Sequence, residues 1–165
     1  MQRHFVTFDN ALIERVFQPT ADTISDRLGL SQWRAARFCI DLASLGWILS
    51  QSQALSDAVL TWDAGLASAR FVLLLLGLVA LTALRSLLQR AAGGVTGNPL
   101  RLAMRPHRAV VLLMLVARIA NGGEMSMATL ADLAMLGFAT AALYLGACAA
   151  RPPMRRRVGA AWDIA

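Results

Sequence analysis

Residues 71–84, with the sequence FVLLLLGLVALTAL, decide the fold, because no charged side chain occurs at fourteen consecutive positions. The only polar group in this run is the hydroxyl of Thr82, and Arg70 and Arg85 stand at its two ends. An α-helix rises about 1.5 Å per residue, so roughly 20 residues cross a hydrocarbon layer of about 30 Å. A helix on the surface of a soluble protein carries a polar stripe, which this segment lacks. It therefore predicts a transmembrane helix over residues 69–89.

The composition is that of a small membrane protein. Of the 165 residues, 57% are hydrophobic and 16% are charged, whereas soluble domains average about 25% charged residues. The mean hydropathy is +0.54. The net charge of +6 does not indicate a nucleic-acid binder, because the charge is not spread as a basic face would be. All 16 basic residues are arginine, which in an alanine-rich chain is typical of a GC-rich bacterial genome.

Three more apolar segments predict an all-α fold, a polytopic bundle of four transmembrane helices over residues 36–150. The expected spans cover residues 36–58, 69–89, 101–120 and 129–150. The first span contains two aspartates and two glutamines, so a half-buried helix along the bundle is the alternative to a crossing. These residues are Asp41, Gln51, Gln53 and Asp57. Asp41 follows Arg37 by one helical turn, and the two side chains can neutralise each other near an interface. The third span requires a helix that begins near Leu100.

The arginines predict the orientation. Residues 85–108 contain five arginines and the tail at residues 151–165 contains four, whereas residues 51–69 before Arg70 and residues 121–128 contain none. Arginine excess marks the cytoplasmic side of a membrane. Four spans with both termini in the cytoplasm of a bacterial inner membrane satisfy this rule, and the tail is then a basic cytoplasmic segment. The first ten residues have no compact apolar core, so no cleaved signal peptide is expected.

Residues 1–35 predict an amphipathic helical segment at the cytoplasmic face. Its apolar residues recur at helical spacing: Phe5, Phe8, Leu12 and Val16. Asp9 is expected to cap the first helix and Pro19 to end it. A second helix is expected to end at Gly29, and Ser31 to cap the next one. The segment lies on lipid or a partner, or packs on the protein's own cytoplasmic side, and the sequence does not choose between these.

The turn at residues 29–31 is similar to the turn of a helix-turn-helix module. In such a module the second helix enters the major groove and shows a polar face to the bases. Here the second helix continues into FCIDLASLGWIL (residues 38–49), an apolar stretch that needs covering. A membrane-tethered DNA-binding regulator is therefore only a remote alternative, and nucleic acid is not an expected partner.

The last span contains small residues at four-residue spacing. They form two series, one of Gly137 and Ala141 and one of Ala142, Gly146 and Ala150. Lipid gives helices no hydrophobic reason to associate, so close contact at small residues is a main source of helix pairing. These five positions are the predicted helix-packing face.

Three charged residues gather around the turn at residues 121–123. They are Arg118, Glu124 and Asp132. Charges inside a membrane are costly, so such residues are a functional-site hypothesis by default. The simpler interpretation is an interfacial ion pair, from Arg118 to Glu124 or to Asp132, that holds the hairpin. The alternative is a proton or ion relay through Asp132, with Asp41 at the opposite side of the membrane.

No catalytic, cofactor-binding or metal site is predicted. The chain has no HExxH, CxxC, GxSxG or phosphate-binding Gly-Lys-Ser/Thr motif. Cys39 and Cys148 lie in apolar segments, where cysteine behaves as a small hydrophobe. Haem ligation needs two histidines on facing spans, and His4 lies outside every predicted span, which leaves only His107.

The expected function is therefore that of a non-catalytic accessory or scaffold subunit of a larger membrane complex. Its expected partners are the lipid bilayer and other membrane subunits or further copies of itself. The alternative is a small channel, transporter or holin-like pore former that uses Asp132, Asp41 and Arg118.

Overall fold

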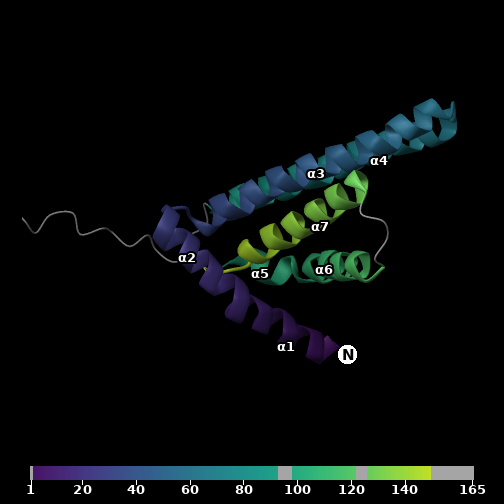
Figure 1. Cartoon of the computed structure of the whole chain (residues 1–165). Coiled ribbons are helices and arrows are strands. Elements are labelled where there is room, and N and C mark those ends of the chain that lie inside the picture. Colours follow the sequence, from purple (N-terminus) through teal and green to yellow (C-terminus); the bar gives the residue numbers. More distant parts are fainter. Residues whose placement is uncertain (1, 93–97, 122–125, 150–165) are drawn as a thin grey trace, which may run out of the picture.

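The computed structural model describes residues 2–92, 98–121 and 126–149, and every regular element in these ranges is a helix (Figure 1). The predicted all-α class is therefore confirmed. Helices α3 (Gln32–Leu60) and α4 (Ala64–Ala92) form one long hairpin. Helices α6 (Arg105–Ala120) and α7 (Met127–Leu145) run beside each other, and α7 packs along α3.

Two of the described helices, α4 and α7, are long and apolar enough to cross a membrane. The four-span bundle is therefore not confirmed. Helix α3 has the length to cross a membrane, but its polar residues make it less apolar than α4 and α7. Helix α6 has only 16 residues, which extend about 24 Å and fall short of a hydrocarbon layer of about 30 Å.

The predicted third span is broken at Met104. A five-residue helix, α5 (Pro99–Ala103), ends there, and α6 begins at the next residue. Pro106 explains the break, because proline has no N–H to bond the carbonyl four residues earlier and its ring clashes with that carbonyl. The helix restarts with Pro106 in its first turn, where the missing N–H costs little.

The N-terminal segment differs from its prediction in two ways. Helices α1 (Gln2–Leu12) and α2 (Gln18–Leu28) are joined without interruption by the π-helical turn η1 (Ile13–Phe17). The prediction that Pro19 ends the first helix is wrong, because this wider turn leaves Pro19 in the first turn of α2. The prediction that Asp9 caps a helix is also wrong, since Asp9 lies inside α1 and is completely buried.

The connection between α2 and α3 confirms its prediction. Gly29 adopts a left-handed conformation with φ +63°, and its N–H donates to the carbonyl of Ser25 at 3.0 Å. Only glycine adopts this conformation without cost, so it ends α2. The Ser31 hydroxyl then accepts the N–H of Arg34 and caps α3.

Two glycines allow α3 to pack closely on both of its neighbours. A Cβ atom at Gly46 would lie 3.0 Å from the backbone of Ala131 and of Met135 in α7. A Cβ atom at Gly77 of α4 would lie 2.1 Å from the indole nitrogen of Trp47. That nitrogen donates to the carbonyl of Leu74 at 3.1 Å. An indole deep in an apolar segment is thus accommodated by a glycine and paired with a backbone carbonyl.

We predict that Gly77→Ala lowers the free energy of unfolding in detergent by about 1–3 kcal/mol, because the added methyl group displaces the Trp47 indole. Gly137→Ala is the matched control, since no atom lies within 4 Å of a Cβ placed there. Thermal unfolding of the two variants tests the prediction. Equal stabilities would contradict it.

Candidate functional site

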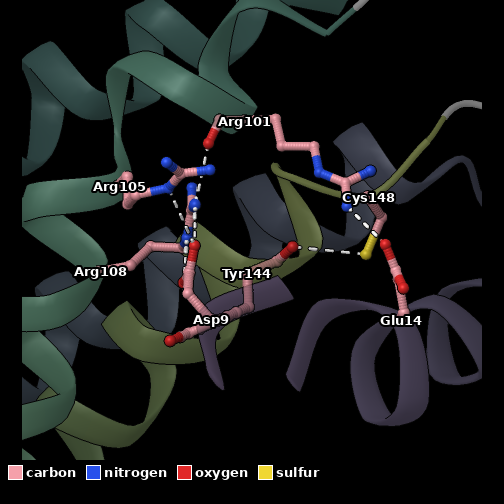
Figure 2. Close-up of polar contacts among 7 residues, drawn as sticks. All are labelled: Asp9, Glu14, Arg101, Arg105, Arg108, Tyr144 and Cys148. Carbon is pink, nitrogen blue, oxygen red and sulfur yellow. Dashed lines mark hydrogen bonds and ion pairs between the residues drawn. The ribbon is translucent and has the colours of Figure 1, made fainter. Parts of the chain in front are cut away.

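A buried ion pair joins the N-terminal helix to the start of α6 (Figure 2). The Nε and Nη2 atoms of Arg108 donate to the two carboxylate oxygens of Asp9 at 3.0 and 2.6 Å. Both side chains are fully buried. This two-bond geometry is the strongest way in which an arginine binds a carboxylate. It connects residues that lie 99 positions apart in the sequence.

Further arginines surround this pair. The Nε atom of Arg105 lies 3.5 Å from a carboxylate oxygen of Asp9. Arg108 also donates to the backbone carbonyl of Arg101 at 2.8 Å, which ties α6 to α5. The side chain of Arg101 in turn pairs with Glu14 of η1 at 2.9 Å, in a solvent-exposed position. Two separate contacts therefore hold the N-terminal helices against α5 and α6.

Aromatic stacking adds to the same junction. The rings of Phe17 and Tyr144 stack with centroids 4.7 Å apart and an angle of 14° between their planes. The guanidinium carbon of Arg108 lies 5.6 Å from the centre of the Tyr144 ring, within reach of a cation–π interaction. The buried cation thus contacts a carboxylate from α1 and an aromatic ring from α7.

Amide side chains bind the chain just after α7. Asn98 donates to the carbonyls of Gly146 and Cys148 at 2.7 and 2.9 Å, and Gln32 donates to that of Cys148 at 2.7 Å. Gln18 accepts the N–H of Ala149 at 2.9 Å. Gly146 and Cys148 are buried beyond the end of α7, so the bonds from Asn98 and Gln32 satisfy carbonyls that burial would otherwise leave unpaired.

Cys148 lies in this segment as a structural residue. Its thiol donates to the carbonyl of Tyr144 at 3.3 Å (Figure 2). Burial, followed by the nearby charge of Asp22, raises the pKa of the Cys148 thiol to about 11. The thiol therefore stays protonated at neutral pH and is not prepared to act as a nucleophile.

Two of the three charges predicted near the 121–123 turn lie together. Arg118 and Asp132 are 3.6 Å apart, and the hydroxyl of Ser50 in α3 donates to the Asp132 carboxylate. Glu124 lies outside the described residues. The cluster connects α3, α6 and α7 at the end of the bundle opposite Asp9.

Asp41 pairs with an unexpected partner. Its carboxylate lies 3.4 Å from Arg85 of α4, in an ion pair that is about half exposed, and not beside Arg37 as its place in the sequence suggested. The other ion pairs among the described residues follow the same pattern, since each joins two helical segments and not two turns of one helix.

The predicted small-residue face divides into a packed part and an open part. Ala142 is fully buried, and a Cβ at Gly146 would lie 2.7 Å from Leu88 of α4. Gly146 caps α7 and is not inside the helix. Ala141 is half-buried and Gly137 faces open space. Ala150 lies outside the described residues.

Within the described ranges, no group of three or more His, Cys, Asp or Glu residues is arranged to hold a metal ion. Comparison with known protein families, with curated proteins and with solved structures finds no match to the chain.

Sequence reasoning missed the Asp9–Arg108 pair, although one signal was present. Asp9 follows Phe5 and precedes Ile13 by four residues, so its carboxylate lies on the apolar side of the helix. A charge on an apolar face needs a partner of opposite charge from another segment. Nothing local in the sequence identifies that partner as Arg108.

We predict that Asp9→Asn lowers the free energy of unfolding by about 3–5 kcal/mol, because it leaves Arg108 buried without a counter-charge. Replacing both residues, as Asp9→Leu with Arg108→Met, should restore most of the stability. Glu14→Gln is the control, because its pair with Arg101 is exposed and contributes about 0–1 kcal/mol. Unfolding in detergent provides the measurement, and equal losses for Asp9→Asn and Glu14→Gln would contradict the prediction.

Proposed function

We propose that the chain is an integral membrane protein that acts as a non-catalytic accessory or scaffold subunit of a larger membrane complex. The observation that carries this proposal is that the charged side chains hold the helices together. The ion pairs of the described residues fix one helical segment against another. Asp9 is the most buried carboxylate among them, and Arg108 binds it. Such pairs position helices and leave the carboxylates without a free role in acid–base chemistry.

The exposed surface of α4 supports the membrane placement. Only 6% of its most apolar stretch is buried inside the protein, although the helix is long enough to cross a bilayer. The core helix of a soluble protein would be covered on most sides. Large apolar side chains point outward along α4, among them Phe71, Leu75, Leu76 and Val79. Lipid tails are the environment that such a surface fits.

We propose that the arginine-rich end, where α5 and α6 begin, lies on the cytoplasmic side of a bacterial inner membrane. Both chain termini are proposed to lie on the same side. The rule that arginines collect on the cytoplasmic side supports this orientation. The helical segment from α1 to α2 would then lie at the cytoplasmic face. Phe8 and Val16 are exposed on it. A segment that is anchored by a buried ion pair and displays apolar side chains is suited to contact another subunit.

The alternative function is a small channel, transporter or holin-like pore former. It requires Asp132, Asp41 and Arg118 to line a common path. Asp132 binds Arg118 and Ser50, and Asp41 binds Arg85. These contacts favour a structural role, because a relay carboxylate must exchange its proton or ion with the path.

We expect the full chain to stay in the membrane pellet after alkaline extraction, and a photo-reactive residue in place of Phe8 to cross-link to a defined protein. The same residue in place of Leu76, on the exposed face of α4, should cross-link to lipid. Recovery of the chain in the soluble fraction would contradict the membrane placement. A chain that remains in the membrane but forms no protein adduct from position 8 would contradict the subunit role.

A second prediction distinguishes a scaffold subunit from a channel or transporter. Asp132→Asn should reduce stability, and Arg118→Gln in the same chain should recover part of the loss, because contacting residues couple by about 0.5–3 kcal/mol. Thermal unfolding in detergent measures both effects. Proton or ion flux in reconstituted vesicles that is present in the wild-type chain and absent in Asp132→Asn would favour the transporter.

A further inference from the structure

A cavity of about 560 Å³ lies between α4, α6 and α7. It extends along the bundle from Trp47 and Gly77 to Met104 and His107. Because α4 and α7 run toward the arginine-rich end and α6 runs away from it, the second pair of residues marks the end nearest the arginines. The remaining lining is aliphatic or methionine, and among the described residues His107 is its only ionisable side chain.

The described part of the chain leaves this space unfilled. Protein interiors are packed to the density of organic crystals, and few voids exceed the size of a water molecule. The volume lies within the range of about 300–1,000 Å³ that is typical of sites for small molecules. Two small residues of α4, Ala80 and Ala83, line the cavity and are exposed, so it opens toward the surroundings of the bundle.

A partner helix is a poor fit for this volume. With its side chains a helix is about 10–12 Å across and rises about 5.4 Å per turn, so about one turn would occupy the whole space. A flexible hydrocarbon chain, in contrast, can follow an elongated cavity with an apolar lining. The cavity shape therefore favours a single acyl chain.

The end of the cavity near the arginines has an available positive charge. Arg90 follows Leu87, a lining residue, by three positions, so it continues the same face of α4 by one helical turn. Among the described residues Arg90 has no ion-pair partner, whereas Arg108 and Arg101 are engaged by Asp9 and Glu14. His107 lines this end of the cavity, and Arg90 lies one helical turn beyond it with no ion-pair partner among the described residues. This arrangement matches an amphiphile with an anionic head.

We infer that this cavity binds an anionic phospholipid, with one acyl chain inside and the phosphate at Arg90 and His107. Basic pockets between transmembrane helices on the cytoplasmic side bind the head groups of anionic lipids. The inference rests on the proposed membrane placement. It adds a specific lipid site to what would otherwise be general contact with the bilayer.

Lipid binding to the purified full chain tests the inference. The delipidated protein in mild detergent is titrated with phosphatidylglycerol and with phosphatidylcholine of the same acyl chains, and bound lipid is counted by native mass spectrometry. The wild-type chain binds phosphatidylglycerol more tightly. Arg90→Gln weakens that binding by about fivefold, which corresponds to the usual contribution of one basic residue near the membrane surface. Arg70→Gln, near the opposite end of α4, removes the same charge without this effect.

Cavity-filling variants test the acyl-chain site. Ala80→Phe fills the opening and lowers the affinity for both lipids. Val79→Phe adds bulk at the adjacent position, which is exposed but does not line the cavity, and leaves both affinities unchanged. Equal wild-type affinity for the two lipids would overturn the lipid site, and so would equal effects of the two Phe variants. Either result leaves the membrane placement intact if the chain is still found in the membrane fraction. A wild-type chain in the soluble fraction would overturn the membrane placement as well.

Discussion

The arrangement of the helices depends on the burial of one carboxylate, that of Asp9, against Arg108. Two charges removed from water are tolerated only if they pair with good geometry, so the position of α1 relative to α6 has little freedom. The contacts of Glu14 with Arg101 and of Phe17 with Tyr144 lie on the same side of the N-terminal segment. Once the ion pair forms, the neighbouring contacts follow at low entropic cost, because their backbones are already placed.

The π-helical turn makes this series of contacts possible. Asp9, Ile13 and Ala21 are buried and Phe17 stacks on Tyr144, so the inward residues recur every four positions. In a regular α-helix with 3.6 residues per turn, each step of four residues overshoots a full turn by about 40°, and the inward face would drift away from the bundle. The wider turn at η1 takes up the extra residues and keeps the four positions in line. The same turn leaves Pro19 at a tolerated position.

The sequence predicted the parts of the fold that depend on local pattern. The helix over the apolar run at residues 71–84, the left-handed Gly29 and the cap at Ser31 each depend on neighbouring residues, and the structure contains all three. The break at Met104 is also local, since Pro106 causes it, whereas the apolar pattern of residues 101–120 predicts one continuous helix.

The candidate site could not be predicted in the same way, because its partners come from distant segments. Asp41 illustrates the difference. The nearest arginine in the sequence is one turn away at Arg37, yet the ion pair forms with Arg85 from the neighbouring helix. Helical spacing shows which side chains share a face, but the choice of partner depends on how two helices cross. The amide contacts of Gln32 and Asn98 with the carbonyl of Cys148 arise in the same manner.

The small residues of α4 that line the cavity have two different roles in packing. On the side of α4 that faces α3, position 77 is a glycine, and the Trp47 indole fills the space that a side chain would take. Farther along, Ala80 and Ala83 are also small, but no side chain from the described chain occupies the room that they leave. Small residues therefore serve two purposes on α4. Where the chain supplies a large neighbour they permit tight packing, and where it supplies none they leave the space that we propose as a lipid site.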